Sequence, residues 1–352
     1  MLSQSMTAFG APLEAVNTPT PEPQGTEVLL KVHHVGVCHS DVHLHDGYFD
    51  LGTGKKLSLE SITLPHTLGH EIEGEVVATG ADVTGLVPGQ RYAVYPWIGC
   101  GLCAACRRGE ENLCARPRHL GCSPRAAGGY ASHVMVPHPK YLLDYGALPP
   151  ALAAILMCSG LTAFGAIRKI GALAGEDQIL LIGCGGVGLM AIQFARALTG
   201  RDPIAADIDD SRLATARAAG ASTTCNTTET GAARKLFADT QGGAFAAVDF
   251  VGSESSFAFA NASVRKGGKI ICVGLFGGAV TMPLPLFPLR ALSVIGSYVG
   301  SLADAEEMMR IVRAGTIAPI PVTTGPLSEA DSALDDLRLG RTRGRKVLMP
   351  QA

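Results

Sequence analysis

The chain has 352 residues and a formal charge of −2, with 31 acidic residues against 29 lysines and arginines. This near balance argues against a nucleic-acid or membrane-surface partner, since such partners select a basic excess or a basic patch. The length exceeds that of most single cores and 47% of the residues are hydrophobic, so we expect two domains. Residues 1–20 contain neither a basic nor a sustained apolar run. We therefore expect a cytoplasmic protein with reduced cysteines.

The pattern of predicted elements changes along the chain. Residues 27–144 are short β-rich runs separated by glycine and proline, which predicts a small barrel-like β unit. After residue 161, strands alternate with amphipathic helices, which predicts a parallel sheet covered on both faces. The tail has two amphipathic helices and a last strand, residues 344–350, that could return to the first domain. The apolar stretch 147–170 contains Pro149 and Pro150, and we interpret it as two short buried helices that meet near Cys158 rather than as a membrane span.

Four cysteines follow a Cys-x2-Cys-x2-Cys-x7-Cys spacing with glycines between them. Zinc binds four thiolates in a tetrahedron, and short glycine-containing loops let one lobe of backbone surround a single ion. Two disulfides are the alternative, although they would need an oxidising compartment. A closed four-cysteine site has no open coordination position, so this zinc would be structural. Its predicted ligands are Cys100, Cys103, Cys106 and Cys114.

A glycine-rich turn follows the predicted strand 179–182 and precedes a predicted helix. Such a turn lets the backbone approach a pyrophosphate at the helix N-terminus and lets the helix pack closely on the sheet. Asp207 ends the next strand, where its carboxylate can accept hydrogen bonds from an adenosine ribose. The same carboxylate would repel the 2′-phosphate of NADP, and Arg212 alone does not make a phosphate pocket, so NAD is predicted. The glycines of the turn are Gly183, Gly185, Gly186 and Gly188.

A second metal site is suggested by three residues far apart in the chain. Cys38 ends an apolar run, His70 lies in a Gly-His-Glu sequence, and Cys158 lies in the stretch 147–170. Two cysteines and a histidine can give three protein ligands and one open position, as in a catalytic zinc site. Distant ligands leave no local pattern, so spacing alone does not distinguish this site from inert buried residues.

Together these motifs resemble the zinc-dependent medium-chain alcohol dehydrogenases. Gly-Val-Cys-His-Ser-Asp-x-His, Gly-His-Glu, the four-cysteine loop, Cys-x-Gly-x-Thr and Gly-x-Gly-Gly-x-Gly occur in the order and spacing of that family over nearly the whole chain. The resemblance implies an α/β protein with a GroES-like β-barrel catalytic domain, residues 1–159, and a Rossmann domain with a doubly wound parallel sheet, residues 160–298. Residues 299–352 would return to the catalytic domain. NAD and two Zn²⁺ ions per subunit are the implied cofactors.

The resemblance also implies how the catalytic zinc is held. Cys38, His70 and Cys158 would be its ligands, and Glu71 would lie behind it as an alternative or transient ligand. Asp41 would accept a hydrogen bond from His70 and so fix the orientation of that ligand.

Further roles implied by the resemblance concern the proton and the cofactor. Ser40 would bond the substrate oxygen and pass its proton through the nicotinamide ribose to His43. Thr162 and Val187 would position the nicotinamide ring, and Arg345 would contact the pyrophosphate. The backbone groups that would bind the carboxamide belong to Val273, Ser297 and Val299.

Two features depart from the family pattern. His39 follows the first zinc cysteine, where many members have arginine, so a phosphate contact there becomes weaker or pH-dependent. The stretch 48–65 is longer than in several relatives, which puts the rim of the substrate site in doubt. Trp97, the only tryptophan, either lines the substrate pocket or packs structurally. The remaining histidines and cysteines that we interpret as ordinary residues are His33, His34, His45, His66, Cys122, Cys184, Cys225 and Cys272.

The sequence therefore predicts an oxidoreductase that transfers hydride between a primary or secondary alcohol and NAD, giving an aldehyde or ketone. A zinc polyol dehydrogenase of the sorbitol type is the alternative within enzymes and would require a polar pocket. A catalytically silent protein that binds zinc and NAD is the alternative outside enzymes, but Ser40 and His43 argue against it, because such a protein needs no proton relay. The expected partners are a small-molecule substrate and other copies of the chain, as a homodimer or homotetramer.

Overall fold

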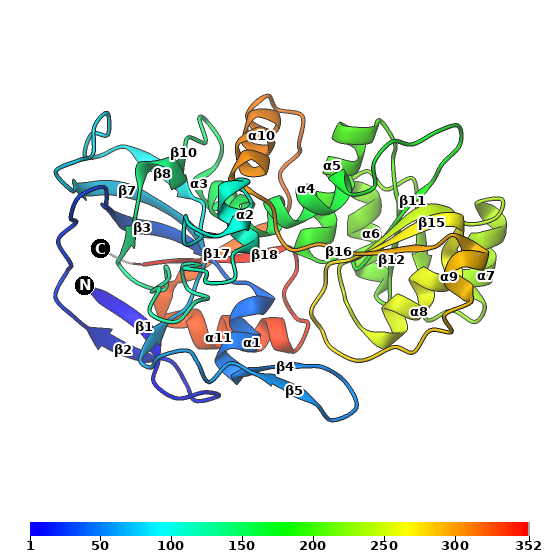
Figure 1. Ribbon diagram of the computed structural model, residues 1–352, viewed down its shortest axis with the longest axis horizontal. Coiled ribbons are helices and arrows are strands. Elements are labelled where there is room, and N and C mark those ends of the chain that lie inside the picture. Colours follow the sequence, from blue (N-terminus) through cyan, green and yellow to red (C-terminus); the bar gives the residue numbers. More distant parts are fainter. Residues whose placement is uncertain (351–352) are drawn as a thin grey trace.

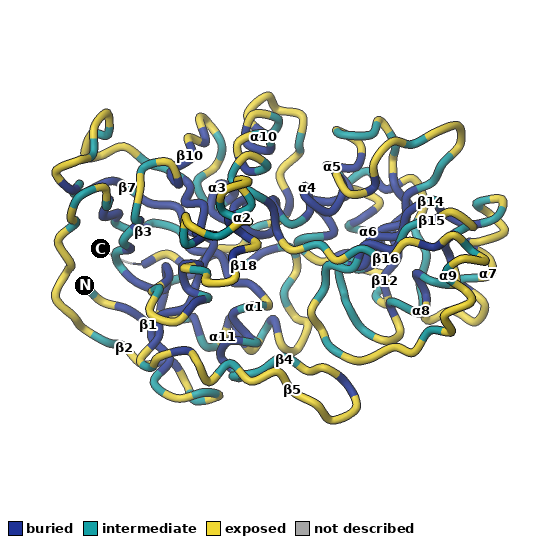
Figure 2. The backbone as a smooth tube through the Cα atoms, in the orientation of Figure 1, coloured by how far each residue is buried: buried dark blue, intermediate teal, exposed yellow. Residues whose placement is uncertain are grey.

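Two lobes lie side by side in the computed structural model, which describes residues 1–350 (Figure 1). One lobe contains both ends of the described chain, and the other contains the segments from β11 to β16. Buried segments run through the middle of each lobe, and exposed segments form the outer loops (Figure 2). The larger hydrophobic core includes residues of both lobes, such as Val35 and Val248, with Leu161 and Phe164 between them. The smaller core lies wholly in the second lobe.

A seven-stranded sheet forms the first lobe, with β3 and β7 paired antiparallel at its centre. In β3 the alternate residues Val28, Leu30 and Val32 are fully buried, as a period of two predicts for a strand with an apolar face. Val347 of β18 pairs with Gly36 of β3, which confirms that the last strand returns to the first domain. The strands, in sheet order, are β10 (Leu142–Leu143), β8 (Arg91–Val94), β7 (Glu71–Thr79), β3 (Val28–Gly36), β18 (Arg345–Met349) and β17 (Val322–Pro326), with β9 (His133–Val136) also paired to β3.

Two smaller strand groups complete the first lobe. β1 (Leu2–Met6) pairs with β2 (Glu14–Asn17) and with β6 (His66–Thr67). β4 (Tyr48–Asp50) and β5 (Lys56–Ser58) form an antiparallel hairpin. This hairpin occupies residues 48–58 of the stretch 48–65, whose role the sequence had left open, and its strands lie below the main sheet in Figure 1.

The second lobe contains the predicted parallel sheet. Ile179, Leu180, Leu181 and Ile182 of its central strand are all buried, because helices cover both faces. All five strand pairings in the sheet are parallel, and together with the first-lobe sheet they confirm the predicted fold class. The strands, in sheet order, are β13 (Thr223–Asn226), β12 (Ile204–Asp207), β11 (Ile179–Ile182), β14 (Ala244–Asp249), β15 (Val264–Cys272) and β16 (Ser293–Gly296).

Helices connect the strands and cover the sheets. The α-helices are α1 (His39–Asp46), α2 (Ala104–Arg107), α3 (Pro150–Ile155), α4 (Leu161–Arg168), α5 (Gly186–Thr199), α6 (Asp210–Ala218), α7 (Ala232–Asp239), α8 (Glu254–Ser263), α9 (Leu286–Arg290), α10 (Leu302–Arg313) and α11 (Ala330–Arg338). Three short 3₁₀ helices are η1 (Glu111–Leu113), η2 (Pro139–Tyr141) and η4 (Leu327–Glu329). The predicted amphipathic helices of the tail correspond to α10 and α11.

One expectation about the apolar stretch needs correction. Instead of two helices that meet near Cys158, the chain forms one continuous helical segment from Pro150 to Arg168. The π-helical turn η3 (Leu156–Gly160) joins α3 to α4 without a break, and it contains Cys158. By length and composition this segment could cross a membrane, but 83% of its most apolar window is buried inside the protein. It is a core helix, and its π turn widens the helix where a functional side chain lies.

Candidate active site

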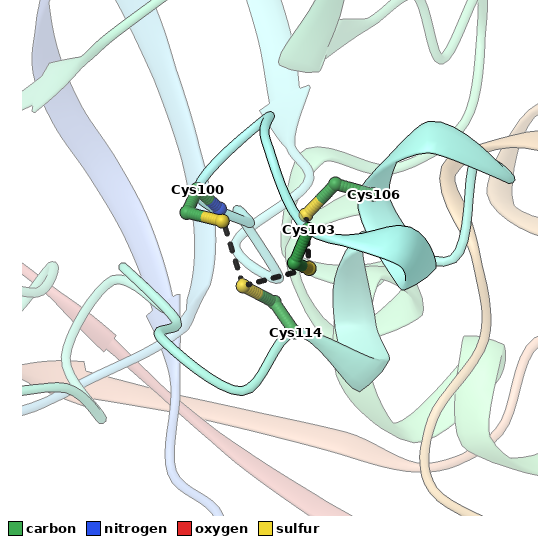
Figure 3. Close-up of side chains that lie close together, drawn as sticks. All are labelled: Cys100, Cys103, Cys106 and Cys114. Atoms are coloured by element: carbon green, nitrogen blue, oxygen red, sulfur yellow. Dashed lines mark hydrogen bonds between the residues drawn. The ribbon is translucent and has the colours of Figure 1, made fainter.

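The four-cysteine loop brings its sulfur atoms together (Figure 3). The four sulfurs all lie within 4.8 Å of one another, with Cys103 3.4 Å from Cys106 and 3.8 Å from Cys114. Thiolates about 2.3 Å from a tetrahedral zinc ion are about 3.8 Å apart, so the donor set fits zinc. All ten cysteines are free, which removes the disulfide alternative.

Backbone groups around this loop favour thiolates. The amides of Cys100 and Arg116 each lie 3.3 Å from the sulfur of Cys114 and donate to it. Hydrogen bonds from the backbone of Leu102 and Cys103 lower the pKa of Cys100 to about 6. Because zinc binds the thiolate form of cysteine, these contacts prepare the loop for the metal.

The second predicted donor set also converges. The ligand atoms of Cys38, His70 and Cys158 lie within 4.8 Å of one another, and the two sulfurs are 4.0 Å apart. Cys38 lies between β3 and α1, His70 directly precedes β7, and Cys158 lies in the π turn, so three separate elements deliver the ligands. Cys158 hydrogen-bonds to Cys38 and holds the pKa of the Cys38 thiol well below its usual range. Two cysteines and a histidine suit zinc, and three ligands leave a fourth position for a substrate.

Asp41 connects several groups around this site. Its buried carboxylate accepts hydrogen bonds from the backbone N–H of Cys38 at 3.0 Å and of Gly69 at 3.2 Å, and from the hydroxyl of Tyr130 at 3.2 Å. One carboxylate oxygen also lies 3.2 Å from Nδ1 of His70. Within residues 1–350 neither buried ring nitrogen of His70 has hydrogen-bond geometry to a partner, so Nδ1 is only close to Asp41, and Nε2 is free, as expected of a nitrogen that binds a metal.

Glu71 is held by two partners in this structure. Its carboxylate accepts a hydrogen bond of 2.6 Å from the hydroxyl of Ser159 and forms a buried ion pair with Arg345. It therefore faces Arg345, and it is close enough to Cys38 and His70 for their charges to affect its pKa, which burial raises. The importance of Ser159 was not recognised from the sequence, since it is an ordinary serine beside Cys158 with no motif of its own.

Arg345 connects the metal site to the glycine turn. A Cβ at Gly186 would overlap the Arg345 side chain, and a Cβ at Gly188 would overlap the carbonyl of Gly183. Both glycines thus permit close approaches that no other residue allows. The Nε atom of Arg345 is buried without a hydrogen-bond partner. An unpaired guanidinium donor beside a turn of this kind fits the pyrophosphate of a dinucleotide.

Further positive charge lies near Arg345. Arg345 and Arg212 are close enough to His39 to affect its pKa. Desolvation lowers the pKa of His39, and the positive charges of the two arginines lower it further. Arg212 donates to the carbonyl of Gly340 at 2.9 Å. Arg343, which the sequence did not point to, donates a hydrogen bond to Ser211. Ser211 lies on α6, next to Arg212.

Asp207 lies at the end of β12 and faces the glycine turn. Its carboxylate accepts hydrogen bonds from the backbone N–H of Cys184 at 2.7 Å, Ile208 at 2.8 Å and Asp209 at 3.1 Å. Both oxygens are thus oriented by the backbone, and Oδ2, which accepts only one of these bonds, keeps capacity for a further donor. This placement suits the recognition of ribose hydroxyls next to the pyrophosphate site.

The residues predicted to hold the nicotinamide end come from several elements. Thr162 lies in α4, Val187 is the second residue of α5, between two glycines of the turn, and Val273 directly follows β15. The buried hydroxyl of Ser297 has no hydrogen-bond partner. Val299 has φ of 48°, which is unusual for a β-branched residue.

Close packing surrounds this unusual backbone position. A Cβ at Gly165 would overlap the carbonyl of Val299, so only glycine fits there. Such strained backbone persists where the surroundings hold it, and it is frequent at functional sites.

Ser40 and His43 both belong to α1. The hydroxyl of Ser40 lies 3.8 Å from the sulfur of Cys38. The ring of His43 lies 4.9 Å from that of Phe49 in β4. A Cβ at Gly52, between β4 and β5, would overlap the backbone of the 277–279 loop, so the hairpin reaches from beside His43 to the second lobe.

Trp97 lies in a group of rings next to the metal ligands. Its ring centroid is 5.4 Å from that of His70, 5.2 Å from His119 and 5.7 Å from Tyr298. Its Nε1–H donates to the carbonyl of Met157 at 2.9 Å, so Trp97 also packs structurally. His119 and Tyr298 were missed in the sequence, because both come from loops that have no recognisable motif. Cys122, interpreted as an inert thiol, is near His70: burial raises the pKa of the Cys122 thiol, and the charge of His70 opposes this rise.

Comparison with known proteins agrees with this geometry. Residues 24–145 match the family described as alcohol dehydrogenase GroES-like domain, and residues 186–314 match zinc-binding dehydrogenase. An NAD-dependent alcohol dehydrogenase of Sulfurisphaera tokodaii is 38% identical over 99% of this chain and 100% of that relative. A solved NAD-dependent alcohol dehydrogenase has 31% identity and a TM-score of 0.89 over 100% of both chains. Acetophenone reductase from Geotrichum candidum, solved with NAD, has 30% identity and a TM-score of 0.85 over 99% of this chain and 97% of that one. The chain belongs to the zinc-dependent medium-chain alcohol dehydrogenase family.

Proposed function

We propose that this protein is an NAD-dependent alcohol dehydrogenase that interconverts a primary or secondary alcohol with an aldehyde or ketone. The observation that carries the proposal is the position of Arg345. Its guanidinium pairs with Glu71 beside the three zinc ligands, while its stem packs on Gly186 in the glycine turn. A single buried side chain therefore links a metal site with an open position to a dinucleotide site. The names of the relatives support the same activity.

Separate residues hold the metal, bind the substrate oxygen and move the proton. When bound, zinc supplies a Lewis acid for the substrate oxygen and NAD supplies a hydride acceptor. Cys38, His70 and Cys158 hold the metal, and Ser40, next to Cys38, hydrogen-bonds the substrate oxygen. Ser40 and His43 are three residues apart on α1 and hence on one helix face, so the pair can move a proton from the substrate side toward solvent.

The cofactor preference follows from one carboxylate. The carboxylate of Asp207 accepts hydrogen bonds from the ribose hydroxyls of NAD and repels the 2′-phosphate of NADP. Arg212 and Arg343 lie at the same edge, but Arg212 is engaged with Gly340 and Arg343 with Ser211. Thr162, Val187 and the backbone around Val299 position the nicotinamide ring.

A panel of alcohols read by NADH absorbance tests the proposal. Purified protein with two zinc ions per chain should oxidise aliphatic, alicyclic or aromatic alcohols with NAD and scarcely with NADP. Turnover of sorbitol above that of all simple alcohols would favour a polyol dehydrogenase instead. Binding of zinc and NAD without turnover of any alcohol would mean that the protein is catalytically silent.

Assembly into a homo-oligomer is also proposed, with the β16 edge as its contact surface. β16 is the last strand of the six-stranded sheet, so one of its sides has no strand partner. Exposed apolar side chains gather on and next to it, which is unusual for a free surface. These side chains are Leu275, Phe276, Val280, Leu284, Leu286, Leu289 and Val294. Light scattering should show a dimer or tetramer, and Phe276→Asp with Leu289→Asp should give monomers.

The domain limits and the location of the protein are proposals as well. We place the first domain boundary between residues 159 and 160, within η3, and the second between residues 298 and 299, between β16 and α10. At both places the chain passes from one lobe to the other. The burial of helix 150–168 within the fold supports a cytoplasmic protein over a membrane-anchored one.

A further inference from the structure

Three rings form a wall beside the metal ligands, and we call Trp97, His119 and Tyr298 the aromatic wall. Trp97 contacts both of the others, and the rings of His119 and Tyr298 lie 6.2 Å apart. Because Trp97 also lies against His70, a substrate whose oxygen reaches the metal would extend along this wall. Such a wall selects an apolar or cyclic body by shape.

One polar atom in the wall has no partner. His119 is 5% exposed, and its Nε2 is buried without any hydrogen bond in the protein. Burial lowers the pKa of His119 to about 4, opposed by a hydrogen bond with the backbone carbonyl of Glu111, so the ring is neutral at neutral pH. Because Nε2 has no partner among the described residues, the contact with the Glu111 carbonyl assigns the proton to Nδ1, which leaves Nε2 with a free lone pair. It is therefore a buried acceptor without a donor.

A second acceptor lies against the same wall. The side-chain amide of Asn112 donates to the carbonyl of Tyr298 at 2.9 Å, while its Oδ1 is buried and unpaired. Leaving a buried acceptor unpaired forfeits its hydration without replacing it, so unpaired buried groups are rare in native proteins. Two of them beside one group of rings indicate a ligand that brings hydrogen-bond donors. The N–H of Trp97 does not fill this need, because it donates to Met157.

We propose that His119 is a specificity-determining residue, which accepts a hydrogen bond from a second hydroxyl group on the substrate. The inference rests on the proposed alcohol dehydrogenase function and narrows its substrate class to alcohols with a mainly apolar body and one further hydroxyl. A sugar alcohol fits less well, because the aromatic wall would leave most of its hydroxyls unpaired. A plain alcohol fits less well too, because it leaves Nε2 of His119 without a donor.

Matched substrates test this inference. Straight-chain diols with a hydroxyl at each end are compared with their monomethyl ethers, over chain lengths of three to eight carbons. The ether has nearly the same shape and keeps one oxidisable hydroxyl, but it has no second donor. At the chain length that spans from the metal site to His119, wild type should show a kcat/KM about tenfold higher for the diol than for the ether, the effect of one hydrogen bond. The quantity measured is the ratio within one enzyme sample, which does not depend on the active fraction.

Three variants complete the test. His119→Phe keeps an aromatic ring but removes the acceptor, so its diol-to-ether ratio should fall to about two, the statistical factor for two equivalent oxidisable hydroxyls. His119→Gln keeps an acceptor and should retain part of the preference, which covers the case that the Phe variant folds poorly. His66→Phe is the matched control, since His66 is also a buried histidine but already donates to the carbonyl of Gly121 at 3.2 Å. It should keep the wild-type ratio.

The possible failures are distinguishable. A wild-type ratio near the statistical value of about two at every chain length, with normal oxidation of simple alcohols, would mean that water satisfies Nε2 and would overturn the inference. An unchanged preference in His119→Phe would overturn it as well, since another group would then bind the second hydroxyl. If no alcohol of any kind were oxidised, the proposed function itself would fail instead.

Discussion

The four-cysteine loop takes all its ligands from residues 100–114, whereas the second metal site takes three ligands from segments up to 120 residues apart. The first site lies in a surface lobe, where three of its four cysteines are partly exposed. The second is enclosed by β3, β7 and the π turn, with His70 fully buried. A local site with four ligands can order only its own loop, while a distributed site with three ligands depends on the whole fold and has a position left for chemistry.

Removing a ligand of the distributed site should have the largest effect on activity. His70→Ala should lower kcat/KM by about 1000-fold, because losing the Lewis acid removes several kcal/mol of transition-state stabilisation. Metal analysis should show one zinc per chain instead of two, and the melting temperature should change little. Cys225→Ser is the control, since Cys225 is a partly buried thiol far from both donor sets. Activity near wild type in the His70 variant would show that this site is not catalytic.

Removing a ligand of the local site should instead affect stability. Cys103→Ser should also leave one zinc per chain, and it should lower the melting temperature by about 10 °C because the metal contributes to folding of the lobe. In the molecules that remain folded, kcat should stay within about threefold of wild type, as expected for a site with no open position. A thousandfold loss of kcat with unchanged melting temperature would reverse the roles assigned to the two sites.

The cofactor site can be probed at a single carboxylate. Asp207→Asn should keep part of the hydrogen bonding to Cys184, Ile208 and Asp209 but remove the charge. The ratio of kcat/KM for NAD to that for NADP should fall about tenfold, since charged hydrogen bonds to the ribose weaken and the repulsion of the 2′-phosphate disappears. Asp210→Asn is the control, because Asp210 begins the next element, α6, and its carboxylate accepts a hydrogen bond from Asn226. An unchanged ratio in the Asp207 variant would mean that its carboxylate does not face the ribose.

The same contrast explains how much the sequence could predict. Elements with strong periodicity or glycine punctuation, such as β3, β11, α5 and the final strand, follow from local patterns. The four-cysteine loop and the glycine turn are likewise local, so their residues could be identified one by one. Cys38, His70 and Cys158 have no local pattern, and only a family resemblance brought them together before the structure did.

What the sequence could not predict depends on tertiary packing. The π turn at Cys158 replaces the expected break because flanking residues are buried and the helix can continue across the core. The roles of Ser159 and His119 arise from neighbours distant in the chain, Glu71 for one and Trp97 for the other. No spacing rule in a single sequence records such contacts.

The proposed proton relay of Ser40 and His43 should give the smallest change in the rate of alcohol oxidation and the most specific pH dependence. Desolvation lowers the pKa of His43, and the charge of nearby His39 lowers it further, so the ring is a neutral base at neutral pH and becomes protonated only below the usual range of a histidine. The rate of alcohol oxidation that depends on His43 should therefore be fully present at neutral pH and decline as the pH falls through that lowered pKa.

His43→Ala should slow alcohol oxidation about fivefold near neutral pH and hardly at all in alkaline solution, where hydroxide can take the proton without a relay. His33→Ala is the control, since His33 pairs with Glu75 at 3.1 Å and belongs to neither metal site. The measurement is kcat across the pH range for wild type and both variants. A profile for the His43 variant that runs parallel to wild type would show that the imidazole carries no proton, and the route from Ser40 to solvent would then have to pass through another group.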